Sequence, residues 1–272
     1  MPELPDLEVI RENLAVRLLG RAVVGVAVRR PGLVQAGAAD LSPLVGKALR
    51  DLTRRGKHLL LHFDSQHVLL IHLMRYGWLW HGPSRYAVTK ATTLVLSFDD
   101  GTDLRLIEPG TPQIAAVWLV SDLSQAEPLA KLGPEPLAPE FTLAAFAQAL
   151  GGKRRILKKA LTDQSIVAGI GNAYADEILF WARLSPFRYV HTLTPEELER
   201  LWRAIPETLR WAIGEIKARA GTNLFDKEIR DFLFVHGRAG APCRVCGTPI
   251  GEVLLENQRT NYCPRCQNVS LR

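Results

Sequence analysis

The feature that most constrains this chain is the placement of its cysteines. All four of them, Cys243, Cys246, Cys263 and Cys266, fall within the last 30 of its 272 residues, as two C-x2-C pairs separated by 16 residues. Each pair can supply two corners of a tetrahedron, and 16 residues suffice for a β-hairpin between the pairs. The spacing therefore predicts one zinc ion in a small C-terminal appendage made in a reducing compartment, rather than disulfides.

Basic residues crowd the same segment, which contains Arg244, Arg259, Arg265 and Arg272. The whole chain carries 34 Lys and Arg against 28 Asp and Glu, a net charge of +6. A basic excess of this kind favours a polyanionic partner, and we interpret the appendage as a finger that touches nucleic acid. A purely structural zinc staple, on a protein with a diffusely basic surface, is the alternative.

The chain shows no sign of a membrane segment or a signal peptide. It has no run of about 18 uncharged apolar residues, and Glu3, Asp6 and Glu8 stand where a signal peptide needs basic and then apolar residues. We therefore expect a cytoplasmic protein without a membrane partner.

Hydrophobic periodicity divides the chain into a β-rich first half and an α-helical second half. Leu7, Ile10, Leu14 and Leu18 form the stripe of an amphipathic helix over residues 5–19. Short β-branched or alternating runs then fill Ala22–Val120. A hairpin turn is expected at Asp99-Asp100-Gly101, and a proline-rich linker at Ser124–Pro139. Four helices are predicted after it, at Phe141–Leu150, Lys153–Leu161, Tyr174–Trp181 and Pro195–Ala218, with Thr194 capping the last.

The N-terminus offers a candidate nucleophile. If Met1 is removed, Pro2 becomes a secondary amine whose pKa lies near 7.7–8.0, so a useful neutral fraction exists at physiological pH. Such an amine can attack a carbonyl carbon and form an iminium, and Glu3 beside it could move protons. The alternative is that Pro-Glu merely begins the chain, and while Met1 is attached the Pro2 nitrogen is an amide.

Two further segments have the chemistry of phosphate contacts. Gly169-Ile170-Gly171-Asn172 precedes a predicted helix, where backbone N–H groups and the Asn172 side chain could meet a phosphate. Arg54-Arg55-Gly56-Lys57 precedes a predicted strand, and Lys57 on a hairpin tip could reach a backbone phosphate. The alternatives are a tight helix–helix turn and a solvated loop.

Together these features resemble one family, the formamidopyrimidine-DNA glycosylases and endonuclease VIII enzymes of base-excision repair. The resemblance covers essentially the whole chain, and the PELP opening looks more like the formamidopyrimidine branch. The segments that resemble the family are PELPDLE at Pro2–Glu8, RRGKHLLL at Arg54–Leu61, LTDQSIVAGIGNAYADEILF at Leu161–Phe180, HGRAGAPCRVCGTPI from His236 and NYCPRCQ to Gln267.

The resemblance implies an α+β fold and a domain layout. We expect an N-terminal helix with a β-sandwich at residues 1–125, a linker at 126–140, a helical helix–two-turn–helix domain at 141–235, and a zinc-finger β-hairpin at 236–272. Damaged double-stranded DNA is the expected partner, and one structural zinc ion the expected cofactor. We expect the protein to be a monomer in the bacterial cytoplasm, associated with the nucleoid.

Family roles carry over residue by residue. Pro2 corresponds to the Schiff-base nucleophile, Glu3 to the acid/base, and Lys57 to the hairpin lysine that assists elimination. Lys153 and Asn172 match positions that contact phosphate near the lesion. The resemblance thus implies a glycosylase with β- and δ-elimination lyase activity on a flipped-out nucleotide.

Some family positions are altered. Where the family has a void-filling methionine this chain has Arg75, with Met74 one place earlier, so we expect Met74, Arg75 or Tyr76 to fill the gap. Counting from the cysteines puts Gln258 at the family's finger-arginine position, with Arg259 one residue later. A slip within the hairpin would restore Arg259 to that site, and we count it with the catalytic residues. The alternative is that its side chain faces away, because one residue reverses side-chain direction in a strand.

The family's D-P-R-R-F-G motif is absent, because Glu108-Pro109 runs into Gly110-Thr111-Pro112. The stretch between Gly221 and His236 is also several residues shorter than the family loop that caps 8-oxoguanine. Oxidised pyrimidines, ring-opened purines and abasic sites are the substrates left open. The leading hypothesis is a bifunctional glycosylase, the second is a lesion-binding member without efficient chemistry, and the third is an unrelated zinc-ribbon RNA-binding protein.

Overall fold

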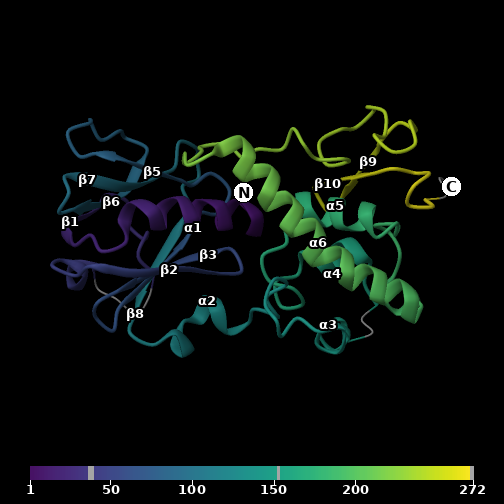
Figure 1. Ribbon diagram of the computed structural model, residues 1–272, viewed down its shortest axis with the longest axis horizontal. Helices are drawn as coiled ribbons and strands as arrows, with labels where there is room; N and C mark the ends of the chain where they lie inside the picture. The colour runs from purple at the N-terminus through teal and green to yellow at the C-terminus, as the bar shows by residue number, and fades with distance from the viewer. Residues whose placement is uncertain (36–39, 152–153, 270–272) are drawn as a thin grey trace. The chain divides into compact units, whose positions relative to one another are not determined.

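The computed structural model describes residues 1–35, 40–151 and 154–269, and the chain divides into two compact units (Figure 1). Unit 1 comprises Met1–Ala130 and Ile216–Glu228, and unit 2 comprises Lys131–Glu215 and Ile229–Arg272. Among the described residues, no helix has both the length and the apolar character needed to span a membrane.

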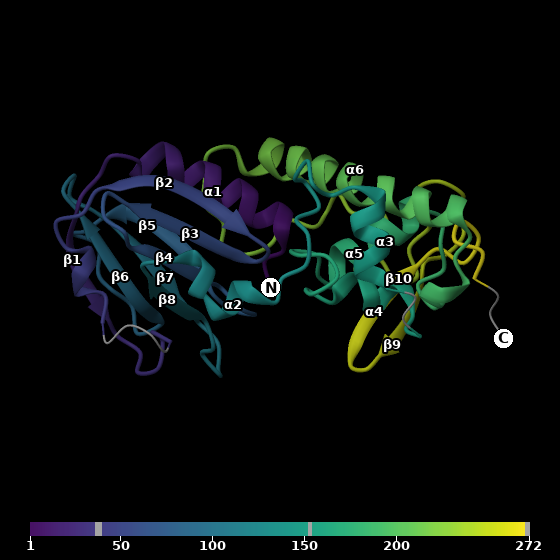
Figure 2. The same cartoon turned by 90° about the horizontal axis from the view of Figure 1, so that it is seen from below.

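Unit 1 begins with helix α1 (Leu4–Leu18), which presents the predicted apolar stripe to the core. Leu7, Ile10, Leu14 and Leu18 are each at most 2% exposed. The helix packs along β2 (Figure 2). Burying four such side chains contributes on the order of 1.5–3 kcal/mol each.

The β-sandwich of unit 1 consists of two four-stranded antiparallel sheets, with strand orders β1-β6-β7-β5 and β2-β3-β4-β8. The strands are β1 (Val23–Val28), β2 (Leu49–Arg55), β3 (His58–Phe63), β4 (Val68–His72), β5 (Trp78–Pro83), β6 (Thr92–Phe98), β7 (Thr102–Ile107) and β8 (Ala116–Val120). Leucines from both sheets and from α1 form one core. The predicted turn at Asp99–Gly101 joins β6 to β7, where Gly101 takes φ +76°.

Short helices follow the sandwich and lead into unit 2. The described helices are α2 (Glu127–Ala130), α3 (Leu143–Leu150), α4 (Leu157–Thr162), α5 (Asn172–Trp181) and α6 (Pro195–Ala220), with 3-10 turns at Ser42–Leu44, Leu123–Gln125 and Val190–Thr192. Thr194 caps α6 as predicted, because its Oγ1 accepts a hydrogen bond from Glu197 N while the Glu197 carboxylate accepts one from Thr194 N.

Three predicted helix starts were wrong. The helix expected from Tyr174 begins two residues earlier, at Asn172. The helix expected from Lys153 begins at Leu157, because Ile156 is extended and forms a β-bridge with Tyr189. The helix expected from Phe141 begins at Leu143, because the Thr142 hydroxyl accepts a hydrogen bond from Ala145 N and so marks the N-cap.

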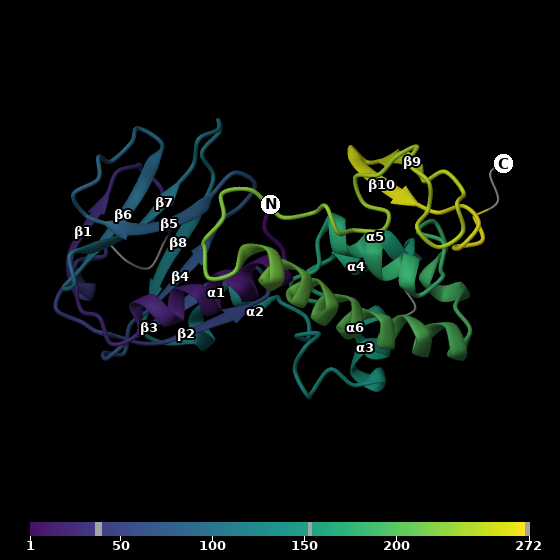
Figure 3. The same cartoon turned by 45° about the horizontal axis from the view of Figure 1, so that its top comes forward.

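The C-terminal segment forms the predicted β-hairpin, from β9 (Gly251–Leu255) and β10 (Gln258–Tyr262). Glu256 and Asn257 both take positive φ at the two-residue turn, as a tight hairpin requires. The hairpin lies beside α5, and β10 contacts this helix (Figure 3). The predicted α+β class, with an N-terminal helix, β-sandwich, helical region and terminal hairpin, is confirmed.

Candidate active site and metal centre

Pro2 lies in unit 1 at the edge of a small cavity. It is buried and lines a space of about 210 Å³ together with Arg75, Tyr76 and Glu228. Met1 precedes it, and the Met1 ammonium forms an ion pair with Glu228 Oε1 at 2.6 Å. In a chain that retains Met1 the Pro2 nitrogen is an amide, so only the processed chain would present an amine at this cavity.

Glu3 and Asp6 bring two carboxylates to the start of α1. Glu3 is 4% exposed and Asp6 is fully buried. The two form a capping box, in which Glu3 N donates to Asp6 Oδ2 at 2.8 Å and the Glu3 carboxylate accepts from the Asp6 backbone N–H. This exchange satisfies helix donors and fixes the backbone immediately after Pro2.

Lys57 lies at the turn between β2 and β3 and is 7% exposed. The turn is held by Gly56, whose φ is +56°, and by the Arg54 guanidinium, which donates to Gly56 O at 3.0 Å. Burial lowers the pKa of Lys57, and the negative charges of Glu3 and Asp6 oppose that shift. The solvated-loop alternative for Lys57 is therefore wrong, because this lysine is buried and interacts electrostatically with both carboxylates of the capping box.

The three candidate void-filling residues lie on the connection between β4 and β5. Met74 takes φ +52°, and its backbone N–H donates to His72 Nδ1 at 3.0 Å. Arg75 and Tyr76 are exposed, with the Arg75 guanidinium carbon 6.0 Å from the Tyr76 ring centroid. Both line the same cavity as Pro2, so this cavity brings together candidates from two separate parts of the sequence.

Two histidines behind this connection were missed by the sequence analysis. The His58 and His72 rings meet edge to face with centroids 4.6 Å apart. Burial lowers the pKa of His58 to about 4. Burial, with the charges of His58 and Lys57, lowers the pKa of His72 to about 3. Both histidines are neutral at physiological pH. They are partners in the register of β3 with β4. The sequence analysis missed the pair because no local sequence signal revealed this register.

In unit 2, Asn172 and Arg259 are brought together. Asn172 is the first residue of α5 and its Nδ2 donates to Arg259 O at 2.8 Å. The Arg259 side chain is 74% exposed and lies 3.9 Å from Glu252 across the hairpin. Lys153, the other predicted phosphate contact, lies outside the described residues.

A buried charge network in unit 2 was also missed. The Lys158 ammonium donates to Asn172 O at 2.6 Å and forms an ion pair with Asp176. Asp176 also accepts hydrogen bonds from Asn261 N, at 3.2 Å, and lies 2.7 Å from His236 Nδ1. The sequence did offer a signal, because Asp176 and Glu177 stand inside the otherwise apolar run of α5. Acidic residues in such a run are expected to be buried, and buried charges must be paired.

The next residue of α5, Glu177, is buried and receives three backbone N–H groups, those of Phe234, Val235 and His236. Burial raises the pKa of Glu177 although these hydrogen bonds lower it. Helix α5 thus holds both the segment that enters the finger and strand β10.

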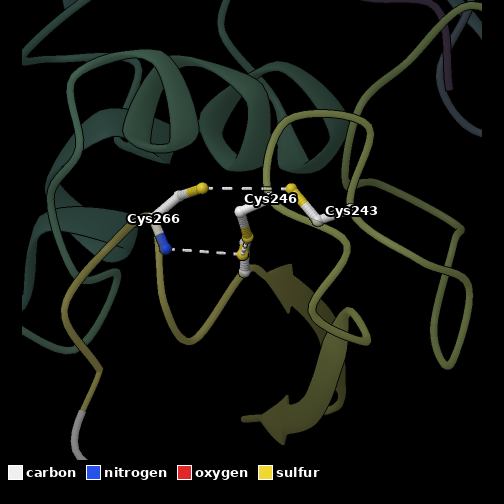
Figure 4. A group of neighbouring side chains, drawn as sticks. Cys243, Cys246 and Cys266 are labelled. Carbon is white, nitrogen blue, oxygen red and sulfur yellow. Dashed lines mark hydrogen bonds between the residues drawn. The ribbon is translucent and has the colours of Figure 1, made fainter.

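The four cysteine thiols converge in the finger. Figure 4 labels three of them, Cys243, Cys246 and Cys266. Their Sγ atoms all lie within 4.8 Å of one another, with 3.9 Å between Cys243 and Cys266 and 3.5 Å between Cys246 and Cys263. A tetrahedral zinc thiolate site has sulfurs about 3.8 Å apart, so the donor set fits such an ion. Burial, and then the neighbouring thiols, raise the pKa of Cys266. Thiolates placed this close repel one another, and a bound cation would offset that repulsion.

Comparison with known proteins places both units in one family. Residues 1–112 match the formamidopyrimidine-DNA glycosylase N-terminal domain, and residues 132–223 match the formamidopyrimidine-DNA glycosylase H2TH domain. A formamidopyrimidine-DNA glycosylase of Listeria innocua is 37% identical over 277 residues, covering 98% of this chain and all of the relative.

Solved structures agree with this match. The MutM (Fpg) protein of Thermus thermophilus has a TM-score of 0.85 at 33% identity, covering 99% of this chain and 100% of that one. The Lactococcus lactis Fpg, solved in a complex with abasic-site DNA, has a TM-score of 0.86 at 27% identity, covering 97% and 99%. The chain therefore belongs to the formamidopyrimidine-DNA glycosylase family.

Proposed function

We propose that this protein is a base-excision repair DNA glycosylase with abasic-site lyase activity, acting through the amine of Pro2. One observation carries the proposal: Pro2 lies at a cavity, directly before two buried carboxylates that interact with a buried lysine. Family membership supports it, because relatives across this family are named as glycosylases and one was solved with abasic-site DNA.

The proposed reaction starts after Met1 is removed. The Pro2 nitrogen attacks C1′ of an extruded nucleotide, the C1′–N bond breaks, and the base leaves with a proton that Glu3 can supply. The sugar ring then opens, because the Pro2 nitrogen has lost its proton and its lone pair forms a double bond to C1′ while the C1′–O4′ bond breaks and O4′ takes up a proton. The resulting iminium withdraws electrons, so the C2′ proton can be lost and the 3′ phosphate expelled by β-elimination. Expulsion of the 5′ phosphate by δ-elimination follows the same logic.

Each remaining site residue has a proposed role in holding DNA. Lys57, with its pKa lowered by burial, assists the elimination near the expelled phosphate. Arg75 and Tyr76, with Met74, fill the gap left by the extruded base. Arg259 and Asn172 contact backbone phosphates from unit 2, with Lys153 as a further contact in the same family pattern. Phosphate contacts of this kind position the duplex rather than read its sequence.

The four cysteines would hold one structural zinc ion, which supplies no chemistry to the reaction and stabilises the finger that carries Arg259. The proposed setting is the bacterial cytoplasm, at the nucleoid, which the bacterial origin of the relatives supports. The proposed substrates are oxidised or ring-opened bases and abasic sites.

Borohydride trapping on a duplex with one abasic site tests this proposal. Wild-type protein, its N-terminus shown by mass to lack Met1, should form a covalent adduct that maps to Pro2. In the variant Pro2→Gly, trapping and nicking should fall at least a hundredfold, while the same duplex is still bound. The secondary amine of Pro2 forms an iminium that is always positively charged, whereas the primary amine of Gly forms an imine that is charged only when protonated. Full nicking by Pro2→Gly would contradict the proposal, and tight binding by processed wild type without any adduct would favour a lesion-binding protein.

A further inference from the structure

The N-terminal amine of this chain has a defined partner. Glu228 Oε1 lies 2.6 Å from the Met1 nitrogen, and the Glu228 side chain is 27% exposed. Glu228 belongs to the segment after α6 that is counted with unit 1, and it lines the cavity beside Pro2. A carboxylate from a distant part of the sequence thus lies where the chain begins.

Covalent geometry limits how far this carboxylate can be from the proposed nucleophile. Three bonds separate the Met1 nitrogen from the Pro2 nitrogen, so the two atoms are less than about 4 Å apart. Adding the 2.6 Å contact places the Glu228 carboxylate oxygen within about 7 Å of the Pro2 nitrogen. Removal of Met1 takes away the ammonium that now pairs with this carboxylate and leaves the Pro2 ammonium as the new N-terminal charge beside it.

We propose that Glu228 is a positioning residue for Pro2, which holds the ammonium of the processed N-terminus by an ion pair at the cavity. This inference rests on the proposed function. When the amine is needed as a nucleophile, the ammonium proton passes to the Glu228 carboxylate. The ion pair thereby becomes a neutral amine and a neutral carboxylic acid, and the freed lone pair attacks C1′.

Other charged groups near Pro2 set the background for this contact. Glu3 and Asp6 are engaged with each other in the capping box of α1, whereas Glu228 contacts the terminal amine directly. The further titratable or charged groups on neighbouring elements are Lys57 on the β2–β3 turn, Arg75 and Tyr76 on the β4–β5 connection, and Asp226 and Lys227 beside Glu228. Of these, Lys57, Arg75 and Lys227 favour the neutral amine, whereas Glu3, Asp6, Asp226 and Glu228 favour the ammonium. Glu228 is the carboxylate that contacts the terminal amine.

The pH dependence of borohydride trapping tests the proposal. Trapping rises with pH as the Pro2 amine loses its proton, and an adjacent carboxylate moves the midpoint of this rise to higher pH. The variant Glu228→Gln should therefore have its midpoint about 0.5 to 1 pH unit below wild type. Glu228→Asp keeps the charge and should keep the wild-type midpoint.

The matched control is Glu127→Gln, which removes the charge of an exposed glutamate in the first turn of α2. Its midpoint should equal that of wild type, and thermal unfolding of all the variants checks that they are folded. A Glu228→Gln midpoint equal to wild type and control would overturn the role of Glu228 while leaving Pro2 chemistry intact. Absence of trapping by processed wild type at every pH would instead overturn the proposed function.

Discussion

At the scale of single residues, the neutral pair His58 and His72 links the interior of the sandwich to the candidate site. His72 Nδ1 accepts the Met74 backbone N–H, an arrangement available to a neutral ring but not to a doubly protonated one. The pKa of His58 is lowered to about 4 and that of His72 to about 3, chiefly by burial. The loop that carries Met74, Arg75 and Tyr76 therefore depends on His72 staying unprotonated.

Acid should destabilise unit 1 through these two rings. In the unfolded chain each histidine takes up a proton near pH 6.5, whereas in the folded chain it does so only near pH 3 to 4. The unfolded state thus binds more protons between these values, and stability is fully present above pH 6.5 and falls as the pH drops. The free energy of unfolding of wild type therefore falls between pH 7 and pH 4. We expect His72→Asn to reduce this fall by on the order of 2–3 kcal/mol.

The measurement is the free energy of unfolding in denaturant at several pH values. At pH 8 the rings are neutral in both the folded and the unfolded state. The difference in free energy of unfolding between His72→Asn and wild type at this pH is therefore the packing cost of the substitution, and it is subtracted from the differences at lower pH. Parallel stability curves for the two proteins down to pH 4 would show that His72 does not titrate on unfolding.

Residue identity was predictable from sequence where the chemistry is local to the chain. The positions of Pro2 and Glu3 follow from their place at the N-terminus, and Lys57 from a short hairpin motif. Asp6 was noted in the sequence only as an acidic residue that argues against a signal peptide, but it is buried and interacts electrostatically with Lys57. Contacts such as that between Lys158 and Asn172 O depend on tertiary packing, and periodicity does not encode them.

At the scale of elements, α5 organises unit 2. One buried residue, Asp176, interacts with Lys158 on α4, His236 at the start of the finger and Asn261 on β10. The strand that carries Arg259 is thereby fixed to the helix that begins at Asn172. The two proposed phosphate contacts consequently share one rigid support.

Removing the charge of Asp176 should disrupt this support. In Asp176→Asn the Lys158 ammonium, 1% exposed, loses its ionised partner, and breaking a buried pair from one side costs about 3–5 kcal/mol. The control Glu199→Gln breaks an exposed pair with Arg203 and should cost less than about 1 kcal/mol.

Chemical denaturation gives both free energies, and hydrogen exchange locates the loss, which should include β10. A cost for Asp176→Asn no larger than that of Glu199→Gln would mean that Lys158 is readily resolvated. The network would then not support the finger.

Elements were predicted most accurately where one apolar face decides the conformation. The stripe of α1 identified that helix to within one residue at each end, and the cap at Thr194 fixed the start of α6. The start of α4 could not be predicted, because Ile156 pairs with Tyr189, a residue more than 30 positions away. A helix propensity is overridden where a long-range bridge takes the backbone groups.

At the scale of the whole molecule, the chain combines a large apolar core in unit 1 with a finger that has very little core. The buried cluster of the finger contains Val235, Ile250 and two of the cysteines, together with Phe180 of α5. A segment this small depends on a metal ion bound by its four cysteines, because it buries too little apolar surface to offset the conformational entropy lost when the segment becomes ordered. Metal removal should therefore act on the finger and spare the sandwich.

Chelation tests this division. Stripping the metal should raise hydrogen exchange in residues 241–267, while exchange in β3 and β4 stays unchanged. Affinity for abasic DNA should fall, and its dependence on salt should become shallower, because contacts such as that of Arg259 no longer release counterions. Adding Zn²⁺ should restore both properties in wild type but not in Cys246→Ser, which lacks one of the four thiolates. If the metal-free protein binds DNA with unchanged affinity and salt dependence, the finger contributes no phosphate contact and binding rests on the remaining residues.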